Sequence, residues 1–351
     1  MKIFSTASTV LVLDAELRDV SVRASSLEKE LRLITCAWSR RVWTLHEALL
    51  ASRHNLWWQF NEEALSAAEI WDNDLVLSCT DISYRNSAME TRFPILSRRG
   101  NDAMSFSRDF LDVVYSLRYR SVSRVEDETI CIAALLLLSR KPLLSTSDPV
   151  ERMRLFLSMW KEIPSYFVFL EGSRIEEAGC GWMPTTFIGS VHKTTLPRAE
   201  EHFTHFDANG LYVNYPGLVI SASNDTALRL ESGFCNPIDG IWYRVRDHGG
   251  IDNSLPAKQK WKFWRQSLHQ VDRPALILEY PSNYSHNYII AVLVNIVREK
   301  DGTLFAKHVC RVWLQPVKPE EGLETQTNPD LGSVSEVLVR ATPLSQKWCV
   351  G

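Results

Sequence analysis

The chain has 351 residues, of which 45% are hydrophobic and 23% are charged, with a net charge of −3. This length admits two domains, or three if one is small, and the composition is typical of a soluble globular protein. The balanced charge provides no field that would recruit nucleic acid or an acidic membrane surface. Seven cysteines without regular spacing favour reduced thiols, and the longest apolar run has about half the length of a membrane span. We therefore expect a cytoplasmic protein with neither nucleic-acid nor membrane partners.

The first 78 residues show alternating strand and helix patterns. Residues 7–13 are apolar and β-branched, which predicts a strand buried on both faces, as in a parallel sheet. Residues 15–35 predict a loop and a short helix. A helix over residues 40–52 and a strand over residues 55–60 follow, and then a helix from about residue 61 to residue 77. This region is therefore predicted to be a βαβ unit followed by a helix.

Glu47 is the candidate functional residue of this region. At about 100° per residue, Trp43 and Glu47 fall together on the flank of an apolar stripe, so the carboxylate lies one turn from an indole. The stripe consists of Val42, Leu45 and Leu49. A carboxylate beside an aromatic ring at the edge of a core is partly desolvated, which strengthens its field on a cation formed nearby. The alternative is that Glu47 is an ordinary residue between core and water, and this window leaves both interpretations open.

The middle of the chain is predicted to be helical. Residues 103–117 place apolar side chains on one face, and residues 127–138 are apolar nearly all round, which indicates a buried helix. Asp148, Pro149 and Glu151 provide a cap, a proline at the first helical position and an acid three residues after the cap. A helix should therefore begin at Pro149 and end before residue 164. Residues 179–200 are predicted to be loop.

From about residue 204 the pattern changes to strands. A strong turn signal at Asp301-Gly302 predicts a hairpin between two of them. The tail after residue 316 is acidic and then rich in Ser, Thr and Pro, so we expect it to be loosely held. The predicted strands cover residues 211–214, 218–222, 241–246, 275–280, 288–297 and 303–314.

Two segments resemble the second half of a fungal heterokaryon-incompatibility (HET) domain. Residues 1–14, MKIFSTASTVLVLD, resemble the M-x-x-I-Y-x-x-A segment of that family and the strand after it, with Phe4 in place of the tyrosine. Residues 38–48, WSRRVWTLHEA, resemble W-x-x-R-x-W-T-x-Q-E, with His46 in place of the glutamine. The region that follows HET domains in many such proteins is similar to residues 120–134, 152–153 and 179–184.

The resemblance implies a fold and an activity. HET domains are similar to TIR domains, in which a tryptophan four residues before a glutamate marks the NAD-hydrolysing carboxylate, and Trp43 and Glu47 match that spacing. Breaking the nicotinamide–ribose bond builds an oxocarbenium-like centre, whose charge a fixed carboxylate stabilises. The resemblance thus implies Glu47 as the candidate catalytic residue, Trp43 as its support and NAD as a substrate, with no cofactor. It also implies a role in fungal nonself recognition and programmed cell death.

Family members carry further strands and helices before the first matched segment, and this chain begins there. We therefore expect an α/β fold with a partial, truncated TIR-like (flavodoxin-like) unit, a helical middle region and a C-terminal β-rich domain. The predicted boundaries are 1–78, 79–200 and 201–316, followed by a loosely ordered tail at 317–351. The missing strands would include the loops that hold the nucleotide, which predicts no intact NAD hydrolysis. Without them the strand at residues 7–13 would have an open edge, which predicts association with a protein partner or a second copy through that edge.

Two alternatives remain. The chain could be a non-enzymatic interaction protein that uses its C-terminal β domain, or an inactive fragment. His202 and His205 with nearby carboxylates could ligate a metal, but no third ligand stands at a recognisable spacing, so no metal site is expected. Trp57 and Trp58 are expected to be core or interface aromatics.

Overall fold

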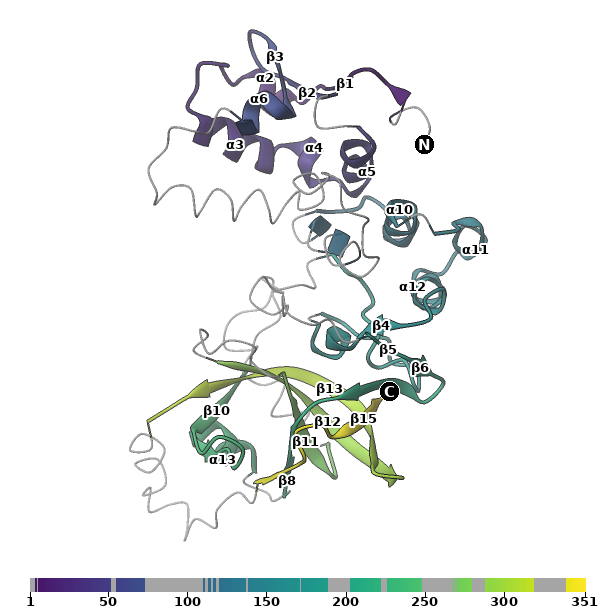
Figure 1. Cartoon of the computed structure of the whole chain (residues 1–351), viewed down its shortest axis with the longest axis vertical. Coiled ribbons are helices and arrows are strands. Elements are labelled where there is room, and N and C mark those ends of the chain that lie inside the picture. Colours follow the sequence, from purple (N-terminus) through teal and green to yellow (C-terminus); the bar gives the residue numbers. More distant parts are fainter. Residues whose placement is uncertain are drawn as a thin grey trace. The chain divides into compact units, whose positions relative to one another are not determined.

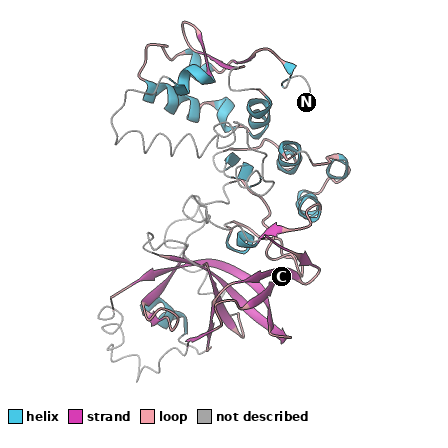
Figure 2. Ribbon diagram, viewed as in Figure 1, coloured by secondary structure: helices cyan, strands magenta, loops and turns pink. Residues whose placement is uncertain are grey.

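The computed structural model combines helices and sheets, with a large sheet in the C-terminal half (Figure 1, Figure 2). It divides into two compact units, which are described separately: unit 1 comprises residues 1–159 and 186–193, and unit 2 comprises residues 160–185 and 194–351. The structure describes residues 4, 6–51, 55–72, 110, 113–114, 116–117, 120–136, 138–170, 172–188, 203–221, 226–247, 268, 270–279, 288–318 and 339–351.

Unit 1 contains a three-stranded sheet of order β1-β2-β3, made of β1 (Val10–Val12), β2 (Leu56–Gln59) and β3 (Ala64–Ser66). β1 and β2 are parallel, with Val10 opposite Leu56, and the chain between them includes α5 (Val42–Leu50). This confirms the predicted parallel pair with a helix in its connection. Trp58 is 1% exposed, as expected of a core aromatic.

Two expectations for this sheet are wrong. Residues 61–66 do not begin a helix: the chain turns, β3 pairs antiparallel with β2, and only then does α6 (Ala67–Asp72) start. The reason is a capping box, because the Ser66 hydroxyl accepts from the Glu69 amide while the Glu69 carboxylate accepts from the Ser66 amide. β1 is also buried on one face only, since Val12 is 3% exposed whereas Leu11 is 47% exposed.

Of the remaining helices in unit 1, the one that begins at Pro149 is confirmed, whereas those at Ala37–Arg40 and Lys141–Leu144 were not predicted. The Asp148 carboxylate accepts from the Glu151 amide at 2.8 Å and caps α12, which buries Met153 and Phe156 as predicted. Of residues 103–117, Phe110 and the other described apolar side chains are buried, and the rest lie outside the described residues. The helices are α2 (Ala15–Arg18), α3 (Ser26–Thr35), α4 (Ala37–Arg40), α10 (Asp127–Leu135), α11 (Lys141–Leu144) and α12 (Pro149–Ser158).

Unit 2 is built on a ten-stranded sheet of order β14-β8-β11-β12-β13-β15-β7-β6, with β10 pairing both β13 and β9. Its members are β6 (Phe206–Asp207), β7 (Gly210–Asn214), β8 (Gly217–Ile220), β9 (Phe234–Cys235), β10 (Trp242–Asp247), β11 (Pro274–Leu278), β12 (Ile289–Lys300), β13 (Thr303–Pro316), β14 (Val339–Ala341) and β15 (Lys347–Val350). The predicted strands are confirmed to within a few residues. The predicted hairpin is β12–β13, and its turn residues Asp301 and Gly302 have φ values of 51° and 72°.

The expectation of a loosely held tail is wrong for residues 339–351. β15 lies between β13 and β7, parallel to the first and antiparallel to the second, and β14 pairs with β8. Trp348 is fully buried, and its indole N–H donates to the Tyr215 carbonyl at 2.9 Å. β15 is only four residues long, so its apolar run was too short to predict a strand after the polar residues that precede it.

The two faces of this sheet have different coverings. One face packs against α13 (Thr226–Ser232) in a core cluster that includes Leu230, Val245 and Leu314. On the other face the His308 ring is hydrogen-bonded to the backbone of Val168, which belongs to the 3-10 helix η1 (Ser165–Phe169). A small two-stranded sheet joins β4 (Ile163–Pro164) to β5 (Phe203–Thr204). No described helix combines the length and the apolar character that crossing a membrane requires.

Candidate functional site

Glu47 lies on α5 at the border of the unit 1 core. The helix buries Val42, Leu45 and Ala48, which confirms the predicted stripe at its first two positions. Glu47 is half-buried, and its carboxylate Oε2 accepts a hydrogen bond from the indole N–H of Trp38 at 3.3 Å. The indole that donates to this carboxylate is therefore that of Trp38 and not that of Trp43, the residue expected to support it.

Trp43 has a different contact. Its indole N–H donates to the Asp127 carboxylate at 3.0 Å, which joins α5 to the start of α10. The contact between Trp38 and Glu47 crosses the break between α4 and α5, so a helical periodicity applied to residues 40–52 could not reveal it. Trp38 is the first residue of the segment that resembles W-x-x-R-x-W-T-x-Q-E, and this resemblance was the sequence signal that could have pointed to it.

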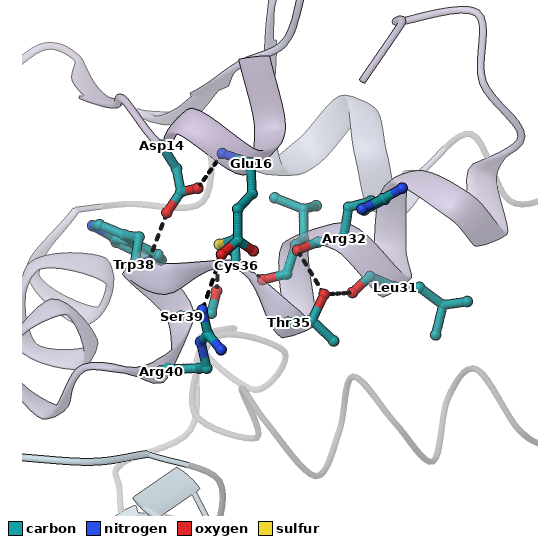
Figure 3. A network of polar contacts seen from close by, with 10 residues as sticks. Asp14, Glu16, Leu31, Arg32, Thr35, Cys36, Trp38, Ser39 and Arg40 are labelled. Carbon is teal, nitrogen blue, oxygen red and sulfur yellow. Dashed lines mark hydrogen bonds and ion pairs between the residues drawn. The ribbon is translucent and has the colours of Figure 1, made fainter. Parts of the chain in front are cut away.

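A buried carboxylate fixes Trp38. The side chain of Asp14, 6% exposed, accepts from the backbone amide of Trp38 at 2.8 Å and from that of Glu16 at 2.9 Å (Figure 3). The Trp38 ring also packs edge-on against Trp58, with centroids 6.1 Å apart. Through these contacts the end of β1 determines where the indole lies, and the indole orients the Glu47 carboxylate.

The first turn of α5 is held by Arg120, which is 5% exposed. Its guanidinium donates to the Arg41 carbonyl at 2.7 Å and to the Thr44 hydroxyl at 3.2 Å. The backbone of Ser121 adds two hydrogen bonds, one from its amide to Arg40 and one from the Val42 amide to its carbonyl. A carboxylate on a helix anchored at its start keeps a fixed orientation, which is what stabilisation of a neighbouring cation requires.

Glu128 is a second buried carboxylate of unit 1, and sequence reasoning did not single it out. It is 1% exposed and accepts from the Thr186 hydroxyl at 2.6 Å and from the Phe187 amide at 2.5 Å. Burial raises its pKa above the ordinary 4.5, although both hydrogen bonds act in the opposite direction. This side chain links residues 186–187 to α10, which is a structural role.

Unit 2 buries ionisable groups on the η1 side of its sheet. Arg174 donates to the carbonyls of Phe167, Leu170 and Trp182, and burial lowers its pKa to about 9. Burial lowers the pKa of His308 well below its usual value, and the nearby Arg174 charge acts in the same direction. Burial has the opposite effect on the carboxyl group of Glu279 and raises its pKa to about 8, although the positive charge of Arg311 acts to lower it. Arg174 thus joins three backbone carbonyls, and His308 joins β13 to η1.

The expected absence of a metal site concerns residues that are only partly described. His202 lies outside the described residues, and the ring of His205 stacks on Tyr212 with centroids 4.5 Å apart. Asp207 accepts from the Asn209 amide and the Tyr212 hydroxyl. Among the described residues, no three His, Cys, Asp or Glu side chains come together as metal ligands would.

Comparisons of this chain with protein-family models, with curated proteins and with solved structures gave no match.

Proposed function

We propose that this chain is a HET-type protein of fungal nonself recognition and programmed cell death, and that Glu47 is the side chain on which this activity depends. The observation that supports the proposal is the position of Glu47. It projects from α5, one of the helices in the connection between two parallel strands, at the edge of the core, with its carboxylate oriented by Trp38.

The chemistry available to such a carboxylate is electrostatic. When the bond between nicotinamide and ribose breaks, nicotinamide leaves with the electron pair and positive charge develops on the ribose, which water then attacks. A fixed carboxylate next to that carbon would lower the energy of the cation. The proposed activity is thus at most a TIR-like NAD glycohydrolase, with NAD as substrate and no resident cofactor.

Expression in a fungal host tests the role of Glu47. We expect the wild-type chain to cause cell death and Glu47→Gln to reduce it, because the amide oxygen can still accept from Trp38 while the charge is lost. Glu63→Gln is the matched control, since Glu63 is exposed and its described hydrogen bond uses only its backbone carbonyl. Cellular NAD measured in the same cultures shows whether death accompanies NAD cleavage. Equal death with wild type and Glu47→Gln at equal protein level would refute the role of Glu47.

A second candidate is a non-enzymatic interaction protein. The observation that favours it is the edge strand β1, on which Leu11 is 47% exposed and Leu13, directly after the strand, is 69% exposed. In this candidate the open edge of the unit 1 sheet associates with a protein partner or with a second copy of the chain, and Glu47 is a residue of the scaffold.

A further inference from the structure

We propose that one face of the unit 2 sheet binds single-stranded nucleic acid. This face is formed by the end of β12, the start of β13, and the neighbouring strands β15 and β7. We call it the basic-aromatic face. Its cations are those of Arg298, Lys300, Lys307 and Lys347, and its rings are those of His205, Tyr212 and Phe305. The inference concerns unit 2 alone and does not depend on Glu47.

The strand register brings the rings and one arginine into a row. Phe305 of β13 is opposite Arg298 of β12 on one side and opposite Cys349 of β15 on the other. Tyr212 of β7 is opposite Cys349, and its amide donates to the His205 carbonyl. Side chains directly opposite each other on paired strands lie on the same face of a sheet, so this row crosses one face from β12 to the residue before β6.

The lysines lie on both sides of this row. Toward the β12–β13 turn, Thr303 is opposite Lys300 on one side and opposite Lys347 on the other. Away from the turn, Lys307 follows Phe305 by two residues and therefore projects from the same face. All three lysines are exposed. A ligand that lies across the row of rings thus meets a lysine on either side.

The rings form two short stacks, and each stack ends in an exposed planar group. The His205 ring lies nearly parallel to the Tyr212 ring, with centroids 4.5 Å apart and an angle of 17° between the planes. The Arg298 guanidinium lies 4.3 Å from the centroid of the Phe305 ring and donates to the Asn209 side chain. His205 and Arg298 are both exposed, and nucleic-acid bases stack on such rings and guanidinium planes.

The neighbouring carboxylates leave the face positively charged. Asp207 is on the same face, but it accepts hydrogen bonds from a backbone amide and from the Tyr212 hydroxyl. Asp301 lies in the hairpin turn, and Glu299 alternates with the two cations of β12 and so projects from the opposite face. In the part of the chain that the structure describes, no carboxylate forms an ion pair with the three lysines or with Arg298.

The combination of rings and cations favours a nucleic acid over an acidic protein. Carboxylates of an acidic peptide would pair with the lysines but would leave the stacks unused, whereas each nucleotide of a single strand offers both a phosphate and a base. The sequence predicted no nucleic-acid partner because its charge is balanced. A net charge is a sum over all residues, however, and it does not show which of them the strand register places on one face.

Fluorescence anisotropy of the full chain with labelled oligouridylate and oligodeoxythymidylate of about ten nucleotides tests the face. We expect saturable binding by the wild type and about tenfold weaker binding by Lys300→Gln/Lys347→Gln, with a slope of log affinity against log salt that is smaller by about 0.7 per lysine. Lys161→Gln/Lys318→Gln is the matched control, because both are exposed lysines of unit 2 outside these strands. No saturable binding by the wild type, or equal affinities of the two double variants, would overturn the proposal.

A second measurement separates a nucleic-acid site from a surface that attracts any polyanion. His205→Ala removes the exposed ring of one stack, and we expect at least about fivefold weaker oligonucleotide binding with unchanged binding of a poly-glutamate peptide. Melting curves verify that each variant keeps the wild-type fold. Wild-type affinity for poly-glutamate equal to that for the oligonucleotides, or unchanged oligonucleotide binding by His205→Ala, would refute the proposal. The tighter of the two oligonucleotides identifies RNA or DNA as the ligand.

Discussion

At the scale of single residues, the Asp14 carboxylate links the backbone of α2 and α4 to the candidate residue Glu47. Its carboxylate caps α2 through the Glu16 amide and also accepts from the Trp38 amide, so two donors depend on one buried side chain. Trp38 in turn donates to Glu47. A change at residue 14 should therefore affect both the stability of unit 1 and the orientation of the candidate carboxylate.

We expect Asp14→Ala to lower the free energy of unfolding of unit 1 by about 2–3 kcal/mol, because it removes a helix cap and leaves a second amide without its acceptor. Urea unfolding followed by circular dichroism measures the loss. Asp19→Ala is the control, because Asp19 is exposed and caps the C-terminus of α2 through its backbone N–H, which the substitution keeps. It should change the free energy of unfolding by only a few tenths of a kcal/mol. Equal losses in the two variants would mean that the Asp14 contacts contribute nothing.

The raised pKa of Glu128 predicts that the stability of unit 1 depends on pH. Burial raises its pKa in the folded chain above the ordinary 4.5, so the folded state holds the proton more tightly than the unfolded state. Its contribution is therefore fully present below pH 4.5 and is lost as the pH rises through the raised value. Unfolding curves of wild type and Glu128→Gln across this range should converge at low pH and diverge above it, with the wild type less stable. Parallel curves would contradict the assignment.

At the scale of secondary structure, the open side of β1 follows from its hydrogen bonds. The Val10 amide donates to the Asn55 carbonyl at 2.7 Å, and β1 is the end strand of the described sheet. In a parallel ladder alternate residues bond to the same neighbour, so the backbone groups of Leu11 point away from β2. Exposed backbone groups and exposed leucines on one short edge are the features of a surface that pairs with another chain.

We expect Leu11→Lys/Leu13→Lys to abolish association of the chain through this edge, because charge on an edge strand opposes pairing. Sedimentation velocity over a range of concentrations measures self-association, and co-purification from the fungal host measures a heterologous partner. Leu27→Lys/Leu31→Lys on α3 is the matched control, since these leucines are 45% and 47% exposed. Association that survives the β1 substitutions would exclude this edge as the interface.

Local signals allowed accurate prediction of several elements. The Asp148 cap, Pro149 and Glu151 determine the start of α12, and Asp301-Gly302 determines the β12–β13 turn, because each signal acts within a few residues. The start of α6 was missed although Ser66 and Glu69 form an equally local capping box. There the helix was predicted to begin at about residue 61, before the cap at Ser66.

Contacts between distant residues could not be predicted in this way. The position of Glu47 on α5 could be predicted from helical periodicity, whereas its donor Trp38 lies on another helix. The hydrogen bond from Arg246 on β10 to Gln315 on β13 spans 69 residues and depends on strand register, which the sequence does not display. Glu128 likewise meets residues 186–187 only through tertiary packing.

At the scale of the whole molecule, the sheet of unit 2 depends on residues from widely separated parts of the chain. Cys349 of β15 is paired with Phe305 on one side and with Tyr212 on the other. The neighbouring Trp348 lies so close to Gly217 that a Cβ there would come within 2.4 Å of its ring. β15 is therefore a central component of this sheet.

We expect Trp348→Ala to lower the free energy of unfolding of unit 2 by about 3–5 kcal/mol, because it leaves a cavity in the core and removes a hydrogen bond to Tyr215. Hydrogen exchange of amides in β7 and β13 measures the effect within this unit. Lys347→Ala, one residue away and exposed, should leave exchange nearly unchanged. Wild-type protection in Trp348→Ala would show that β15 is not needed to stabilise its neighbours.

The place of β15 has a consequence for biosynthesis. A nascent chain that has emerged from the ribosome as far as residue 318 already exposes β7 and β13, whereas the strand that separates them in the sheet has not yet emerged. Until then both strands present unpaired backbone groups to whatever is nearby. Because the chain emerges from its N-terminus onwards, we expect this sheet to need chaperones, and slow emergence of residues 319–350 would lengthen its time at risk of aggregation.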